Sequence, residues 1–195
     1  MSYFKEIDIY HKKFFVIGNS EFLYKKKIGI FISRKIPLNI VIPVEEFLIS
    51  LSNSPFVFIG GWHSPFERRI LKKLLYNGKD IIFFTSKGIQ NQKIYRYLKN
   101  PLKENKLLIA SHLENEQKIT LPSSIKRNET ISDITDYNIF LFIDKGGNLA
   151  KLYDNLIDDG KIPLIFNHPL NSDFIKKGKP VDINNFKEIL VWIGK

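Results

Sequence analysis

The sequence of 195 residues contains no cysteine, which excludes a disulfide, a thiolate nucleophile and any zinc or iron–sulfur site built on cysteine. It also lacks a long hydrophobic run, because no window reaches the ~18 apolar residues that a membrane span requires. An export signal contains a long apolar stretch near the N-terminus. Here the charged residues Lys5, Glu6 and Asp8 come first, and no such stretch follows them. These absences predict a soluble, cytoplasmic protein that does not act in a membrane.

Acidic residues are scarce in the first part of the chain. The formal net charge is +10, and residues 1–110 hold 19 Lys/Arg against 8 Asp/Glu, whereas residues 111–195 hold 11 against 12. Clustered positive charge is typical of proteins that bind nucleic acids, because cation–phosphate contacts release condensed counterions. The same excess also arises in lysine-rich chains whose charged helix faces contact only water, so composition leaves both interpretations open.

The sequence is 44% hydrophobic and 13% aromatic, which is enough to bury the core of a single domain over residues 1–195. Short apolar runs rich in Ile and Phe have the length of strands buried on both faces, and they span residues 27–33, 56–60, 80–85, 106–111, 138–144 and 162–167. Segments with helical spacing of apolar residues lie between them, at residues 44–53, 65–78, 91–100, 123–135 and 148–160. This alternation predicts an α/β fold with a doubly wound, mainly parallel sheet of about six strands flanked by helices.

The two ends of the chain follow this alternation less closely. Residues 1–26 predict an N-terminal extension, a short hairpin or loop packed on the domain before the sheet begins. Residues 171–195 predict two short helices docked at the edge of the sheet.

Glycine and basic residues follow several of the predicted strands. Ligands of doubly wound sheets bind at the carboxyl ends of the strands, where helix N-termini favour anions. The glycine pairs at 60–61 and 146–147 would let the backbone approach a phosphate, and Arg34, Lys35 and Lys145 would supply positive charge. The sequence therefore predicts a phosphate-binding or nucleic-acid-binding site that needs no cofactor.

The segment "GGWHSP", residues 60–65, holds a histidine and a serine but predicts no catalytic residue. Ser64 precedes a proline at a predicted helix start, where serine is usually the N-cap, and a nucleophile elbow would place the serine between glycines. His63 is either a solvated loop residue or a phosphate contact, and Trp62 either fills the edge of the core or stacks on a base. The four histidines share no short spacing, so we expect no metal site.

The order of these motifs resembles the Rossmann-like domain of the DprA/Smf family of DNA-processing proteins. "KKKIGIFISRK" is similar to the family motif "VAIVGSRK", with Ser33, Arg34 and Lys35 on its last residues. "FVFIGG" and the residues that follow it are similar to a glycine-containing family segment that begins "VVSG". "KRNETISDITDYNIFLFIDKGGNL" resembles "RNRIIAGLSDAVLVVEA" followed by "SGSL", which matches Arg127 and Asn128. The resemblance covers roughly residues 14 to 191.

This resemblance implies a non-enzymatic protein that binds single-stranded DNA in transformation and passes it to the RecA recombinase as a homodimer. It implies a binding site that includes Ser33, Arg34, Lys35, Gly60, Arg127 and Asn128. Neighbours in the same loops complete the predicted site, namely Gly61, Trp62, His63, Lys126, Lys145, Gly146, Gly147 and Asn148.

The sequence departs from the family pattern at Ile32, Trp62 and Glu129, which stand where the family has glycine, a small residue and a second arginine. An altered pocket supports a second hypothesis, a domain that senses a small nucleotide or that is vestigial and acts through a protein partner. The loop "GGNLAKLYD" lacks the Gly-Thr pair and the glutamate of "GGxGTxxE" in the similar cytokinin-activating phosphoribohydrolases. Hydrolysis of that kind is therefore not expected.

Overall fold

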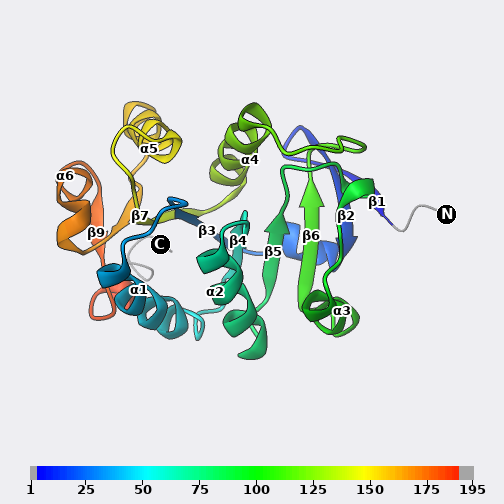
Figure 1. Cartoon of the computed structure of the whole chain (residues 1–195), viewed down its shortest axis with the longest axis horizontal. Helices are drawn as coiled ribbons and strands as arrows, with labels where there is room; N and C mark the ends of the chain where they lie inside the picture. Colours follow the sequence, from blue (N-terminus) through cyan, green and yellow to red (C-terminus); the bar gives the residue numbers. More distant parts are fainter. Residues whose placement is uncertain (1–3, 189–195) are drawn as a thin grey trace. The chain divides into compact units, whose positions relative to one another are not determined.

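All six predicted strands and the five helices between them occur in the structure, a computed structural model that describes residues 4–188 (Figure 1). The predicted strands are β3 (Lys27–Ile32), β4 (Val57–Gly60), β5 (Ile81–Phe84), β6 (Leu107–Ser111), β7 (Tyr137–Phe142) and β8 (Leu164–Phe166). The helices are α1 (Leu38–Leu51), α2 (Pro65–Tyr76), α3 (Arg96–Lys103), α4 (Leu121–Ile134) and α5 (Asn148–Asp158). Every residue of these six strands is buried, which explains their continuous apolar runs. The predicted α/β, Rossmann-like fold is confirmed.

Three further strands belong to the sheet, beyond the six that were predicted for it. The strands β1 (Lys5–Ile9) and β2 (Lys12–Gly18) form an antiparallel hairpin, and β2 pairs antiparallel with β6. The predicted N-terminal extension therefore does not only pack on the sheet, because its strands β1 and β2 form part of it. The strand β9 (Lys179–Val181) pairs parallel with β8 where only helices were expected. Of the two predicted tail helices, α6 (Ser172–Ile175) is present, and the expectation for residues 189–195 lies outside the described residues.

The chain divides into two compact units, residues 1–29 with 55–136 and residues 30–54 with 137–195. The strand order is β1-β2-β6-β5-β4-β3 in the first unit and β3-β7-β8-β9 in the second, because β3 contributes residues to both. The single domain over residues 1–195 stays a prediction. Within residues 4–188, no helix combines the length and the apolar character needed to cross a bilayer.

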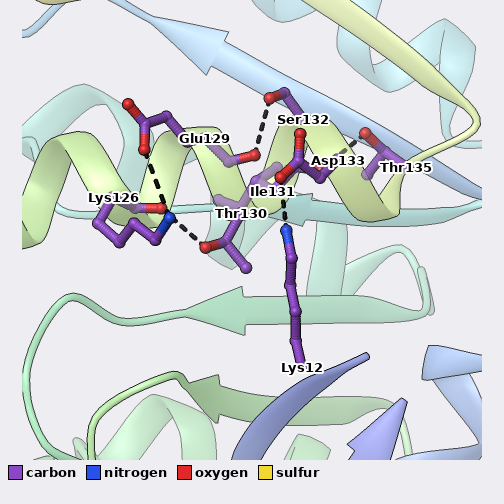
Figure 2. Close-up of polar contacts among 8 residues, drawn as sticks. All are labelled: Lys12, Lys126, Glu129, Thr130, Ile131, Ser132, Asp133 and Thr135. Atoms are coloured by element: carbon purple, nitrogen blue, oxygen red, sulfur yellow. Dashed lines mark hydrogen bonds and ion pairs between the residues drawn. The ribbon is translucent and has the colours of Figure 1, made fainter. Parts of the chain in front are cut away.

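In the first unit, α4 lies at the end of the sheet toward which the arrows of β5 and β6 point (Figure 1). This is the carboxyl end of both strands. An ion pair between Lys12 of β2 and Asp133 ties the helix to the N-terminal hairpin, and the Thr130 hydroxyl donates to the Lys126 carbonyl at 2.8 Å (Figure 2). The hairpin thereby helps to hold the helix that carries three of the predicted site residues.

Candidate functional site

The turn between β4 and α2 brings backbone close to a charged side chain of α4. Gly60 ends β4, and a Cβ added to Gly61 would lie 2.6 Å from Cζ of Arg127. Real Cβ contacts are longer than this, so only glycine allows the guanidinium to approach the turn so closely. The structure therefore brings together two predicted site residues that lie far apart in the sequence.

Arg127 is a part-buried cation that is only partly satisfied by its neighbours. Its Nε and Nη2 donate to Oδ1 of Asn128 at 3.1 and 2.9 Å, which leaves other N–H donors of the guanidinium for a ligand. Desolvation lowers the pKa of Arg127, and the negative charge of Glu67 opposes this effect. The group stays charged at neutral pH, and an anion would compensate the loss of hydration.

Ser64 caps α2, as the sequence predicted. Its Oγ accepts the N–H of Glu67 at 3.1 Å, and its own N–H donates to Oε2 of Glu67 at 2.7 Å, which is a capping box. The cap also positions the Glu67 carboxylate, whose charge acts on Arg127. Ser64 is thus a structural residue of the turn and not a nucleophile.

Trp62 is buried, which corrects its inclusion among the residues that contact nucleic acid. The side chain is 2% exposed, and its Nε1 donates to the Ile82 carbonyl at 3.0 Å. The backbone adopts a φ of 51°, in the left-handed region, which turns the side chain into the core. No face of the indole is open to a base, so of the two interpretations of Trp62 the core-filling one holds. The neighbouring His63 is half-buried, and its ring packs edge-on against Phe83 with centroids 5.5 Å apart.

Two residues at the ends of β5 and β6 belong to the same region and were missed from the sequence. Ser86 is fully buried, and the His112 ring stacks on Phe84 with centroids 6.1 Å apart. Neither Oγ of Ser86 nor Nδ1 of His112 has a hydrogen-bond partner among the described residues. Burial lowers the pKa of His112, and the positive charges of Lys126 and Arg127 lower it further. The negative charge of Glu116 acts in the opposite direction. The available signal was a polar residue immediately beyond a buried strand.

The second unit holds the predicted residues at the ends of β3 and β7. The N–H of Ser33 donates to the Phe142 carbonyl at 2.9 Å, and its Oγ accepts the N–H of Asp144 at 2.8 Å. Ser33 is therefore a buried link between two strand ends. Arg34 and Lys35, which follow it, are exposed and form no ion pair with any residue in the described range 4–188.

The β7–α5 turn presents backbone N–H groups. Gly147 is the N-cap of α5 and provides no side-chain cap, so the N–H groups of Asn148 and Leu149 at the helix start are of the kind that bind anions, whereas the N–H of Ala150 donates to the Gly147 carbonyl at 3.1 Å. Gly146 adopts a φ of 76°, which favours glycine. The charge of Lys145 is offset by Asp173, with 2.5 Å between Nζ and Oδ2.

Asn171 holds this end of the second unit together. It is fully buried, its amide nitrogen donates to the carbonyls of Leu141 and Phe166 at 3.0 and 2.9 Å, and its oxygen accepts the N–H of Ile143 at 3.3 Å. We expect Asn171→Ala to lower the free energy of unfolding by about 2–4 kcal/mol, because three buried backbone groups lose a partner. Urea unfolding measures this, with the exposed Asn167→Ala as control, and an equal loss in both variants would contradict it.

The two units thus carry separate groups of predicted site residues. The first unit gathers Gly60, Gly61, His63, Lys126, Arg127 and Asn128 near the carboxyl ends of β4, β5 and β6, and the second carries Ser33, Arg34, Lys35 and the residues 145–148. Lys126 is exposed and lies 3.8 Å from the carboxylate of Glu129 (Figure 2). Within residues 4–188, no three His, Asp or Glu side chains are grouped to hold a metal ion.

No family model and no curated protein matches the sequence. Among solved structures, the chain is similar to DNA processing protein A of Helicobacter pylori, described for its single-stranded DNA binding mode, with a TM-score of 0.76, 15% identity and coverage of 96% of this chain and 95% of that chain. It is also similar to DprA of Streptococcus pneumoniae, with a TM-score of 0.70 and 16% identity over 90% of this chain and 65% of that chain. The molybdenum cofactor carrier protein of Chlamydomonas reinhardtii matches with a TM-score of 0.57 and 12% identity, over 87% of this chain and 98% of that chain. The resemblance to DprA is therefore confirmed for the fold.

Proposed function

We propose that this chain, whose fold is that of DprA, is a non-enzymatic protein that binds single-stranded DNA through its phosphates. The observation that carries the proposal is the guanidinium of Arg127, which lies against Gly61 at the carboxyl ends of the parallel strands. A planar guanidinium with unused N–H donors fits phosphate oxygens in a bidentate manner. The exposed Lys126 beside it adds positive charge.

The binding is expected to depend on charge more than on base stacking. Trp62 is buried and cannot stack, whereas Arg34 and Lys35 are exposed cations without an ion-pair partner in the described part of the chain. Contacts to phosphate carry little sequence information, so we expect weak preference among base sequences. Homodimerisation and transfer of the strand to a recombinase stay predictions that follow from the resemblance alone.

A salt titration tests the proposal. With contacts from Arg34, Lys35, Lys126 and Arg127, the affinity for a fluorescent (dT)20 should fall about 50-fold between 50 and 200 mM salt, because each phosphate contact in a single strand contributes a slope of about −0.7. Fluorescence anisotropy measures the affinity. The proposal is wrong if no binding occurs at 50 mM salt, or if the affinity does not change with salt.

The likeness to a molybdenum cofactor carrier protein favours a second candidate, a binder of a small ligand. A ligand that binds only the folded state raises the melting temperature, by an amount that grows with its concentration above Kd. Thermal-shift measurements with mononucleotides at millimolar concentration separate the two candidates. A shift with mononucleotides and no binding of (dT)20 would favour the second candidate.

A further inference from the structure

Ser86 lies beside the end of β6 in the first unit. The Thr85 N–H donates to the Ala110 carbonyl at 2.8 Å, and the Ser111 hydroxyl donates to the Lys87 carbonyl at 2.8 Å, so backbone contacts on both sides of Ser86 join it to the neighbouring strand end. Its hydroxyl is buried without a partner among the described residues. A buried hydroxyl in this state is uncommon, because most buried polar atoms are hydrogen-bonded.

His112 lies close enough to α4 for the charges of that helix to act on it. Lys126 and Arg127 of α4 both act on His112, and the guanidinium of Arg127 lies against Gly61. The His112 ring stacks on Phe84, which follows Phe83, the partner of Gly60 in the pairing of β4 with β5. The ends of three consecutive parallel strands thus contribute a close backbone approach, a serine hydroxyl and an imidazole.

The loops that carry Ser86 and His112 are joined to each other. The N–H of Gly88 donates to the Glu116 carbonyl at 2.9 Å, and the N–H of Ile89 donates to the Leu113 carbonyl at 3.0 Å. A Cβ at Gly88 would lie 2.3 Å from the backbone nitrogen of Glu116, so glycine is needed for this approach. The polar groups are therefore held by paired backbone, which lowers the entropy cost of binding.

We propose that Ser86, His112 and Arg127 form a subsite for one phosphate group, which binds together with a proton that His112 takes from solvent. The subsite rests on the proposed function, since the phosphate belongs to the bound strand, and it adds two residues and a pH dependence. The Ser86 hydroxyl, the imidazolium and the unused N–H groups of Arg127 donate to the phosphate oxygens. No covalent bond forms or breaks.

The charges that face His112 set the direction of the pH dependence. Lys126 and Arg127 of α4 and burial beside Phe84 lower the pKa of His112 from its usual 6.5, and Glu116 in the following loop opposes them. This lowered pKa favours the neutral imidazole in the free protein. A bound phosphate favours the imidazolium and raises the pKa, so binding tightens as the pH falls through the raised value and levels off below the value of the free protein.

Oligonucleotide binding at two pH values tests the subsite. In anisotropy titrations with labelled (dT)20 at constant ionic strength, the wild-type protein should bind about three- to sixfold more tightly at pH 6 than at pH 8, within the tenfold limit that a pKa change of about one unit sets. His112→Asn should bind equally at both values, within about twofold. Ser86→Ala should bind several-fold more weakly at both and keep the wild-type ratio. His168→Asn, a histidine of the second unit, serves as the control and should also keep that ratio.

Each outcome separates the subsite from the proposed function. Equal wild-type binding at both pH values, or a wild-type ratio in His112→Asn, overturns the subsite and leaves strand binding intact. Absence of oligonucleotide binding at both pH values and 50 mM salt overturns the proposed function. An NMR titration of the His112 ring with inorganic phosphate then decides the subsite by itself, because an unchanged pKa of His112 overturns it even if the variants do not fold.

Discussion

Replacement of Trp62 by alanine is expected to lower the free energy of unfolding by about 3–5 kcal/mol. The indole is 2% exposed and is among the largest fully buried side chains, so its removal leaves a cavity. The variant also loses the hydrogen bond from Nε1 to the Ile82 carbonyl, which leaves a buried acceptor with one bond fewer. Urea unfolding followed by circular dichroism measures the change.

Matched variants separate the contributions of Trp62. Trp62→Phe keeps an aromatic ring and loses the N–H, so it should cost less than Trp62→Ala. Tyr76→Ala changes an aromatic residue that is 93% exposed and should remain within about 0.5 kcal/mol of the wild type. A Trp62→Ala variant as stable as the wild type would contradict the burial of the indole.

Burial of Trp62 also predicts the behaviour of this variant toward DNA. At a temperature where Trp62→Ala is folded, its affinity for (dT)20 should be similar to that of the wild type, because the ring makes no contact with a base. A tenfold loss of affinity in the folded variant would indicate that the ring stacks on the strand after all.

Replacement of Arg127 by alanine is expected to weaken binding of single-stranded DNA about 10-fold to 100-fold, because a hydrogen bond to a charged group contributes about 1.5–3 kcal/mol. The slope of affinity against salt should become shallower by about 0.7, as for the loss of one phosphate contact. Arg127→Lys keeps the charge but not the bidentate geometry. Its affinity for the strand should therefore lie between those of the wild type and Arg127→Ala. Anisotropy at several salt concentrations measures both quantities.

Two controls address the position of the guanidinium and the effect of net charge. Gly61→Ala retains every charge, but its Cβ would lie 2.6 Å from Cζ of Arg127, so the guanidinium must move and binding should weaken. Lys177→Ala removes an exposed cation that pairs with Asp154 in the second unit, and its affinity should stay within about twofold. Equal affinities for Arg127→Ala and Lys177→Ala would show that only net charge matters.

Much of the fold could be predicted from the sequence because the parallel strands are buried on both faces. Their apolar runs stand out, and the glycine and basic residues after them indicate where a ligand binds. A hairpin was one of the two alternatives for residues 1–26, but its pairing with β6 was not predicted, because β1 is half exposed and resembles a loop in composition. The short strand β9 has three residues, too few for any periodicity to be recognised.

The candidate site was only partly predictable for a different reason. Sequence and motif order indicated Gly61 and Arg127 separately, but the contact between them depends on how α4 packs on the first unit. Ser86 and His112 carry no motif, and their interest comes from atoms that are buried without a partner among the described residues. A polar residue after a buried strand was the only local signal, whereas burial and unpaired atoms are properties of the packed chain.

The sequence by itself determined the α/β class, the six central strands, the N-cap role of Ser64 and the positive charge of the first part of the chain, because each depends on local composition and spacing. Only the tertiary structure decided that Trp62 fills the core and that Arg127 approaches the backbone of Gly61. It also decided that the loops after β5 and β6, which carry Ser86 and His112, are joined by hydrogen bonds. These outcomes depend on which residues meet across the sheet and the helix above it, and such contacts are set by packing between segments distant in sequence.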